Sequence, residues 1–363
     1  MRWKHAPAGS NWGSFGPDDT RGRMNWVTPA QVLQGMAQVQ TGQTFSLSLP
    51  LDVPGQQTLN PRRGPPRLYG NIRDGAQAGQ QGFAWSLRND DPDLRDVVCD
   101  DVVVMTLQYS TQWDSFAHWG SHFDADGDGV AEAVFYNGFR AGTGVRADHD
   151  SINAGTEDPH AAQTWQRYPG SNGGPLSISN LAEHGAQGCG VLVDIEHHLG
   201  RKQRDVGYDD LMRILEADGI EVGRGDMVCL HTGFADTLLQ MNRQPDLAHL
   251  NAIGSGLNGR DDKLLQWITD SGLACLIADN LAVENFMPKL ASAAQAGSKI
   301  THTLLPLHEH CLFKNGIHLG ELFYLTPLAR WLRDHARHRF LLTAPPLNLP
   351  GAVGSPATPI ATV

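Results

Sequence analysis

The sequence predicts a mixed α/β fold, from its composition and from the order of its apolar segments. Hydrophobic residues make up 40% of the 363 residues and charged residues 18%, while 40 Gly and 21 Pro indicate many turns and ordered loops. A chain of this length can bury a large core. After residue 100, short apolar runs alternate with helical patterns, which is typical of strands buried between helices.

Five short apolar or β-branched runs predict buried strands: 102–107, 190–194, 227–231, 273–278 and 340–343. Two segments between them predict helices. Residues 209–217 place apolar side chains on one face at the third-and-fourth spacing, and 261–269 repeat this pattern. Because no repeat, low-complexity tract or charged linker marks a boundary, residues 1–363 are expected to form a single domain.

The first hundred residues are expected to form an irregular amino-terminal arm and extension. Thr28, Pro29 and a stop at Gly42 predict one helix over 30–40, and 45–51 alternate like a strand. Residues 60–70 are too rich in Pro and Gly for a regular element, so they are expected to form a covering loop. The Pro-rich tail, 345–363, is expected to extend over the surface or over a partner subunit.

The charge and the cysteines restrict the classes of partner. A formal net charge of −11 opposes binding to nucleic acid or an anionic membrane, and no Lys/Arg run offsets it. No segment approaches the ~18 apolar residues of a membrane span, and the amino-terminal residues lack the apolar stretch of a signal peptide. The 5 Cys form neither a disulfide pattern nor a CxxC pair. We therefore expect a small-molecule substrate and a reducing, cytoplasmic location.

A first group of candidate metal ligands follows the run 102–107. Asp114 and His118 lie four residues apart in STQWDSFAHW. A carboxylate and an imidazole at the end of a buried strand can converge on one metal ion. The alternative is that Asp114 caps a turn and His118 belongs to a half-buried hydrogen-bond network.

A second group lies near the carboxyl end, in THTLLPLHEHCLFKNGIHLGELF. His308 and Glu321 are flanked by leucines and Phe313, so burying them would be costly unless they bind a metal or each other. His302, His310 and His318 belong to the same stretch. The alternative is a satisfied core histidine and a surface glutamate.

Two further acidic segments carry weaker signals. Residues 194–198, DIEHH, could bind a metal, but adjacent histidines at a strand end point apart. Residues 124–129, DADGDG, imitate the start of a calcium loop, yet Phe135 occupies the twelfth position, where a glutamate is required. We expect a solvated turn there. The chain also lacks a GxSxG elbow, a P-loop and a GxGxxG after a strand, which disfavours serine hydrolases, nucleotide phosphatases and dinucleotide enzymes.

The first group resembles a known motif. STQWDSFAHW is similar to the HxGTHxDxPxH metal motif of kynurenine formamidases, isatin hydrolases and related "cyclases". Further segments agree in order with the longer bacterial members: 11–19, 136–138, 190–194, 225–226, 231–233, 278–280, 283–284, and His308 with Glu321. The resemblance implies a swivelling β/β/α fold around a barrel-like mixed sheet, a bound divalent metal ion, zinc or manganese, and a homo-oligomer, either a dimer or a tetramer.

The resemblance also implies roles for individual residues. Asp114 would be a metal ligand, His118 a ligand or the general acid/base, and His308 and Glu321 would close the site from the carboxyl-terminal side.

Two positions depart from the motif, because its first two histidines are here Gln108 and Gln112. An amide oxygen is a weaker metal donor than imidazole, so a metal position built on these residues should be weakened or lost. Gln112 remains a candidate oxygen ligand of one catalytic ion.

These observations together predict a metal-dependent hydrolase that cleaves an amide or lactone bond of a small cyclic or aromatic substrate with metal-activated water. His118, or otherwise His308, would carry the proton. Trp113, Phe116 and Trp119 could line a flat pocket, although ordinary core packing is the simpler interpretation. The two glutamines suggest an alternative, a metal- or ligand-binding member of the family without hydrolytic activity.

Overall fold

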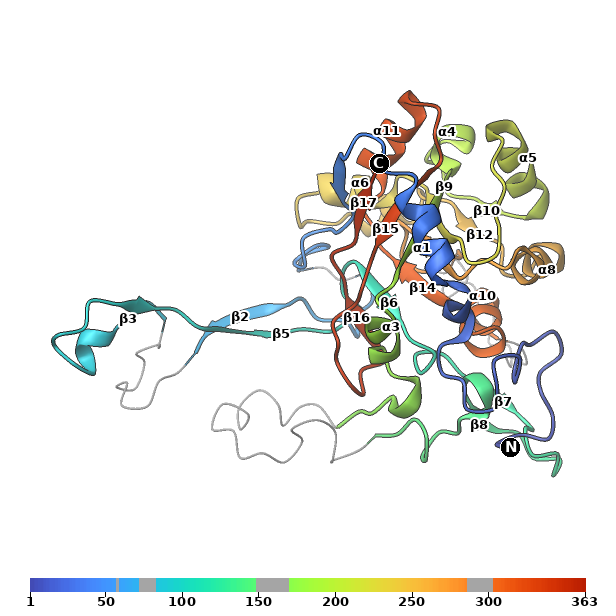
Figure 1. Cartoon of the computed structure of the whole chain (residues 1–363), viewed down its shortest axis with the longest axis horizontal. Helices are drawn as coiled ribbons and strands as arrows, with labels where there is room; N and C mark the ends of the chain where they lie inside the picture. The colour runs from blue at the N-terminus through green and yellow to red at the C-terminus, as the bar shows by residue number, and fades with distance from the viewer. Residues whose placement is uncertain (57–58, 72–82, 148–169, 286–302) are drawn as a thin grey trace.

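The computed structural model describes residues 1–56, 59–71, 83–147, 170–285 and 303–363. Its centre is a curled, nine-stranded mixed sheet with the strand order β1-β17-β15-β9-β11-β13-β14-β6-β16 (Figure 1). The strands are β1 (Thr44–Ser46), β6 (Gln112–Asp114), β9 (Gln187–Asp194), β11 (Met227–His231), β13 (Cys275–Ala278), β14 (His318–Glu321), β15 (Arg339–Thr343), β16 (Gly354–Pro356) and β17 (Ile360–Thr362). The central strands β9, β11, β13 and β14 are parallel, and the flanking strands are antiparallel. The predicted α/β fold with a barrel-like mixed sheet is confirmed.

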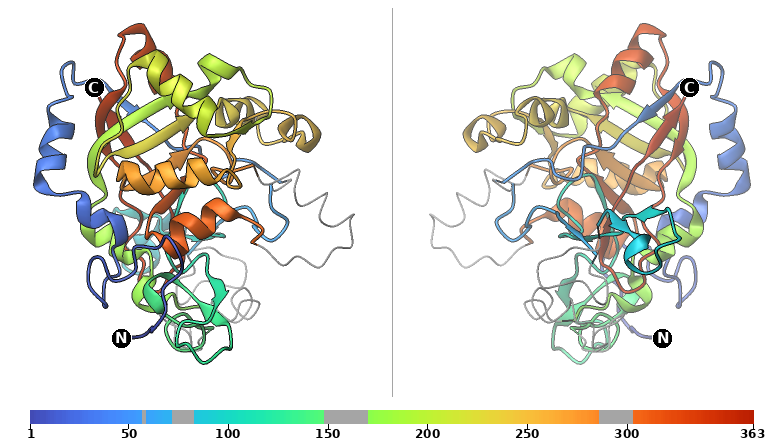
Figure 2. Two further views of the ribbon diagram at one scale, coloured as in Figure 1. Left: turned by 90° about the vertical axis from the view of Figure 1, so that its right-hand side faces the viewer. Right: turned by 90° about the vertical axis from the view of Figure 1, so that its left-hand side faces the viewer.

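Helices cover both faces of this sheet (Figures 1 and 2). They are α1 (Pro29–Met36), α3 (Ser179–His184), α4 (Ile195–Leu199), α5 (Tyr208–Asp218), α6 (Phe234–Gln240), α7 (Leu247–Leu250), α8 (Asp262–Ser271), α10 (Pro306–His308) and α11 (Thr326–Asp334). Successive side chains of β9 enter different cores: Val191 and Val193 pack with the apolar faces of α5 and α8, whereas Leu192 packs with that of α11. A strand buried on both faces has a continuous apolar sequence, which is why these strands could be recognised.

The predicted helices form with small differences at their ends. In α5 the predicted apolar face is buried, and α8 begins at Asp262, where the Asp261 carboxylate accepts hydrogen bonds from two backbone N–H groups. Helix α1 begins at Pro29 as predicted but ends at Met36 instead of continuing to residue 40. The side chain at the end of this helix is not buried, because Met36 is 54% exposed.

Two amino-terminal predictions need correction. The strand predicted over 45–51 is limited to β1, Thr44–Ser46. After β1 the chain makes only a single bridge, between Ser48 and Phe323, and a turn begins after Pro50. The run 102–107 is not a buried strand of the main sheet. It contributes β5 (Asp101–Val104), which pairs with β2 (Arg67–Gly70), so the end of the predicted loop 60–70 is itself a strand.

The sequence predicts that the carboxyl-terminal tail, 345–363, extends over the surface or over a partner subunit, and that prediction is wrong. β16 pairs with β6 and β17 pairs with β1 and β15, so the tail completes the main sheet in two places. Val363 is fully buried. The amino-terminal residues also pack on their own chain, where Trp3 packs edge-on against Trp12 and Trp12 packs edge-on against Phe313. Prolines interrupt the tail and keep each of its strands short.

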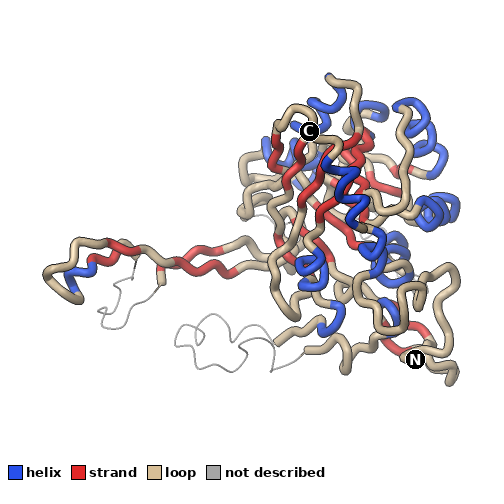
Figure 3. Tube along the Cα trace, in the orientation of Figure 1, coloured by secondary structure: helices blue, strands red, loops and turns tan. Residues whose placement is uncertain are grey.

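An arm leaves the body beside β6 (Figures 1 and 3). It contains β2 and β5, followed by β3 (Trp85–Ser86) paired with β4 (Val97–Val98). The remaining short pairs are β7 (Ser121–Phe123) with β8 (Glu132–Val134), and β10 (Asp205–Val206) with β12 (Gly256–Leu257). Within the described residues, no helix is both long and apolar enough to cross a membrane.

Candidate metal centre

The centre is built on two neighbouring strands. β14 and β6 run antiparallel, with Glu321 directly opposite Gln112 and Leu319 opposite Asp114. Side chains two residues apart on a strand point to the same face. Gln112, Asp114 and Glu321 therefore share one face of the sheet. Trp113, between them, points to the other face, where its indole N–H donates to the Ala344 carbonyl oxygen at 2.7 Å.

Helix α10 brings His308 to this face. Pro306 begins the helix, where its missing N–H costs nothing, and His308 is its last residue. His308 Nε2 lies 3.4 Å from Glu321 Oε1. One ligand atom each from Asp114, His308 and Glu321 lie within 4.8 Å of one another, and all three residues are buried. Such a group could hold one metal ion.

The hydrogen bonding of these residues supports that fit. Asp114 is completely buried, and within the described part of the chain neither of its carboxylate oxygens has a hydrogen-bond partner. The same is true of Gln112 Oε1, while Gln112 Nε2 donates to Glu321 Oε2 at 2.7 Å. Burial raises the pKa of Asp114, because its charge lacks compensating donors. A buried carboxylate of this kind is costly unless a cation neutralises it. The residues therefore fit a divalent ion.

Behind His308 lies Glu284, to which the sequence assigned no role. Glu284 Oε1 accepts the His308 backbone N–H at 3.0 Å and lies 3.0 Å from His308 Nδ1. Burial lowers the pKa of His308, but the hydrogen bonds with Glu284 and Glu321 outweigh it and raise the pKa to about 10. A carboxylate on one ring nitrogen, with the other nitrogen facing the metal, is a recurrent arrangement for histidine ligands.

His118 occupies a different position. Its Nε2 lies 3.9 Å from Asp114 Oδ2, and its side chain is 20% exposed. It also does not belong to the three-residue group. Burial lowers the pKa of His118, and the nearby arginines Arg62 and Arg63 add to this effect against the opposing charge of Asp114. His118 is thus a neutral base at the edge of the centre.

A pocket of about 430 Å³ opens onto the centre. It is lined by Asn60, Arg62, Arg63, Thr106, His118, Trp119, Leu281, Ala282, Leu304, Leu305, His308 and Glu321. The start of the segment 60–70, predicted to be a covering loop, lines this pocket. Arg63 donates to the Gln108 carbonyl oxygen at 2.9 Å and reaches within 3.8 Å of Glu321.

The three aromatic residues of the motif divide between core and pocket. Trp113 and Phe116 are core residues, as the simpler interpretation had it. Trp119 lines the pocket, with its ring edge-on to His308 at 5.4 Å between centroids.

Other predicted candidates lie outside the centre. His310 Nε2 lies 3.0 Å from Thr269 Oγ1, and His318 Nδ1 lies 2.9 Å from the Asp114 carbonyl oxygen. His302 falls outside the described residues. The Gln108 amide lies against Gly354, the residue paired with Asp114 on β16, so it is on the same face as Asp114. Among the described residues, however, neither Gln108 nor any other donor is hydrogen-bonded to the Asp114 carboxylate.

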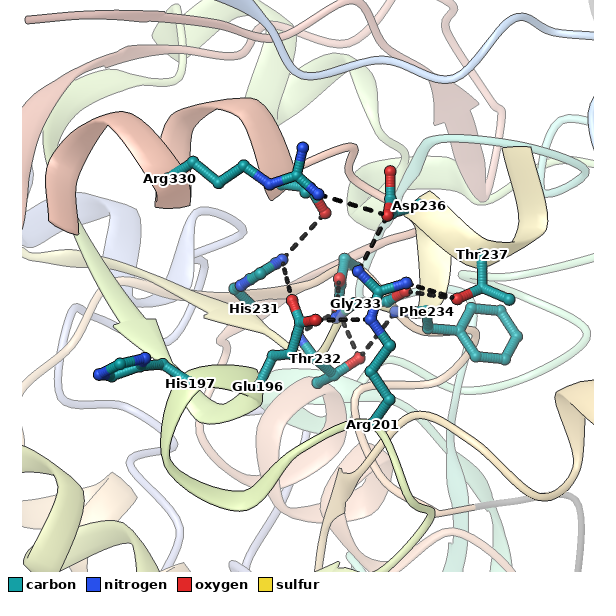
Figure 4. Close-up of polar contacts among 12 residues, drawn as sticks. Glu196, His197, Arg201, His231, Thr232, Gly233, Phe234, Asp236, Thr237 and Arg330 are labelled. Atoms are coloured by element: carbon teal, nitrogen blue, oxygen red, sulfur yellow. Dashed lines mark hydrogen bonds and ion pairs between the residues drawn. The ribbon is translucent and has the colours of Figure 1, made fainter. Parts of the chain in front are cut away.

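The DIEHH segment forms an ion-pair network instead of a metal site. Figure 4 shows the Glu196 carboxylate between His231 and Arg201, and His231 Nε2 lies 3.3 Å from Glu196 Oε2. His231 Nδ1 lies 2.8 Å from Asp194 Oδ1, and Arg201 also pairs with Asp236 at 2.9 Å. Arginine and histidine side chains already pair with these carboxylates, so the geometry does not support a metal site in the segment 194–198.

The acidic segment after β7 is a solvated turn, as predicted. Asp124 accepts backbone hydrogen bonds from Gly127 and Gly129. Arg140 supplies a counter-charge, with ion pairs to Asp126 at 3.3 Å and to Glu132. The carboxylates of this turn lie close enough together to hold a metal ion. They are exposed or only partly buried, however, and Arg140 already pairs with two of them.

Comparison with known proteins identifies the family of the chain. The "Putative cyclase" family profile matches residues 45–285. A solved structure described as a novel cyclase is 28% identical, with coverage of 98% of this chain and 97% of that chain and a TM-score of 0.68. Isatin hydrolase A from Labrenzia aggregata, bound to benzyl benzoate, has 13% identity, coverage of 92% and 97%, and a TM-score of 0.51, which indicates a shared fold. No curated protein sequence matches. Since the profile spans more than half of the chain, the protein belongs to the cyclase family.

Proposed function

We propose that this protein is a metal-dependent hydrolase that cleaves the amide or lactone bond of a small cyclic or aromatic substrate. The observation that carries the proposal is the completely buried Asp114, which lies next to His308 and Glu321. Among the residues that the structure describes, neither of its carboxylate oxygens has a hydrogen-bond partner. The similarity in fold to isatin hydrolase is consistent with this reaction type.

Asp114, His308 and Glu321 would hold the ion, with Gln112 Oε1 as an additional oxygen ligand. One imidazole with carboxylate oxygens is a donor set that suits zinc or manganese. When bound, such an ion polarises the carbonyl under attack and lowers the pKa of water toward ~7.

The remaining residues orient groups and move protons. His118, neutral and at the pocket edge, takes a proton from water and returns it to the leaving nitrogen or oxygen. Glu284 holds His308 so that Nε2 faces Glu321. Trp119 and the leucines of the pocket wall exclude bulk water.

Metal analysis together with a hydrolysis screen tests the proposal. The purified protein, loaded with zinc or manganese, should hydrolyse at least one N-formyl amide, cyclic amide or lactone, with one oxygen from H₂¹⁸O in the product. A chelator should abolish this turnover. Bound metal with no turnover of any substrate in the panel would favour the alternative, a binding protein of the family without hydrolytic activity.

One ion per chain is expected, because the two glutamines weaken a second position. Elemental analysis should find about one zinc or manganese ion per chain, and a Gln108→His/Gln112→His variant should bind more, since imidazole is a stronger zinc ligand than an amide oxygen. A Gln108→Asn/Gln112→Asn variant is the matched control, which changes both side chains without adding imidazole. Two tightly held ions in the unmodified protein would contradict the prediction.

A homo-oligomer, dimer or tetramer, is expected from the arm. A two-stranded ribbon is marginally stable alone, and here the directly paired Leu68 and Val103 are 71% and 46% exposed. The same patch on two copies can pack together around a twofold axis. Light scattering should give a multiple of 39.5 kDa.

A variant with Leu68→Arg and Val103→Arg should shift the protein toward the monomer. Val130→Arg is the control, because Val130 is 65% exposed in the turn between β7 and β8, outside the arm. A monomeric wild-type protein would rule out this assembly.

A further inference from the structure

Two adjacent arginines stand in the wall of the pocket of an acidic chain. Arg63 is engaged, with its guanidinium hydrogen-bonded to the Gln108 carbonyl oxygen. Arg62 lines the same pocket and is exposed. Within the described residues its guanidinium has neither an ion pair nor a side-chain hydrogen bond, since only its backbone N–H is bonded, to Asn60 Oδ1. The described part of the chain therefore leaves this cation available for a ligand.

The rest of the pocket divides by chemistry. Leu281, Ala282, Leu304 and Leu305 give it an apolar side, and Trp119 adds an aromatic ring. His308 and Glu321 line it where it meets the metal centre. A molecule that fills the pocket thus meets apolar side chains, the metal centre and a free guanidinium at once.

Arg62 shares this pocket with the groups of the centre. Arg62, His118 and Glu321 all line it. A negative group bound against Arg62 would therefore lie in the same pocket as the bond that His118 serves.

We infer that the substrate carries a carboxylate beside the bond to be cleaved, and that Arg62 binds this carboxylate. The inference rests on the proposed hydrolysis for its reaction but not for its binding step. A planar guanidinium matches a carboxylate in geometry and charge. A pocket of about 430 Å³ suits a molecule with one ring, whose apolar part packs on the leucine side. The substrate class is an aromatic or cyclic amide or ester that bears a carboxylate.

Binding of benzoate and benzamide to the metal-loaded protein tests the recognition step. These probes differ in charge and little in shape. In Arg62→Gln, calorimetry should show benzoate affinity reduced about tenfold, the loss expected for one partly exposed charged hydrogen bond. Arg67→Gln is the matched control: it removes one positive charge nearby on β2, outside the pocket. It should bind both probes as the wild-type protein does.

Kinetics with N-formylanthranilate and formanilide test the substrate class. Arg62→Gln should lower the ratio of kcat/KM for the carboxylate-bearing amide over the neutral one by about tenfold, mainly through KM, and Arg62→Lys should recover part of it. Arg62-dependent benzoate binding without hydrolysis of either amide would sustain the inference and count against the proposed function. Benzoate that binds no better than benzamide, or equally well to Arg62→Gln, would overturn the inference.

Discussion

Asp114→Asn is expected to remove metal binding and hydrolysis together. The substitution keeps the volume of the side chain but replaces the charged ligand, at a position where no donor in the described part of the chain is hydrogen-bonded to either oxygen. Losing the ion forfeits several kcal/mol of transition-state stabilisation, so kcat/KM should fall by about 10³-fold or more. Elemental analysis and turnover are to be measured on the same preparation.

Thermal and denaturant unfolding separate this effect from misfolding. In chelator, Asp114→Asn should be at least as stable as the wild-type protein, because it removes a buried charge without donors. Metal at a hundredfold excess over Kd should stabilise the wild-type protein by about 2.7 kcal/mol and the variant by nothing. Asp128→Asn, in the exposed turn after β7, is the control and should retain both metal and activity. Full metal content with normal turnover in Asp114→Asn would disprove the site.

The central strands could be predicted because short stretches of their own sequence indicate that they are buried. β9 and β11 have helices on both sides, so each contains an unbroken apolar run, 190–193 and 227–230, that can be recognised without knowing which strand it pairs with. The helices α5 and α8 could also be predicted from their own sequences, because the spacing of their apolar residues places these on one face.

The carboxyl-terminal strands of the sheet could not be predicted from such patterns. β16 and β17 have three residues each, and Ile360 pairs with Ser46 from near the other end of the chain. Three residues carry too little alternation to be recognised, and the prolines of the tail indicated an extended segment without a sheet. In the arm the opposite error occurs, because a pattern predicted a buried strand where there is none. The valines of β5 are typical of a buried strand, but they lie exposed or only partly buried in a two-stranded ribbon.

For the candidate site, the sequence predicted the residues that share a motif. Asp114 and Gln112 lie two apart on one strand, and the register of β14 places Glu321 opposite Gln112. Glu284 belongs to the segment 283–284, which resembles the family but carried no assigned role, and Arg62 had no signal at all. They reach the centre through a loop after β13 and a loop before the arm, and only the tertiary fold brings them there.

His118→Gln is expected to reduce turnover by about 10²- to 10⁴-fold, the range for losing a general acid/base, while metal content stays unchanged. His118 Nε2 lies 3.9 Å from Asp114 Oδ2 and outside the group of three residues that could hold the ion. Burial lowers its pKa, so at neutral pH the ring is uncharged and able to accept a proton. His249→Gln, on the exposed surface of α7, is the control for loss of an imidazole.

Chemical rescue distinguishes proton transfer from metal ligation at this position. His118 lines the pocket beside Trp119 and also faces a second hollow of about 330 Å³ on the side of Phe135. His118→Ala therefore leaves space open to small molecules, and added imidazole should restore part of the activity, with a dependence on pH that follows the pKa of the added base. Loss of the metal ion in His118→Gln, or rescue by zinc or manganese instead of imidazole, would show that His118 is a ligand, and the proton would then have to be carried by another group at the pocket edge.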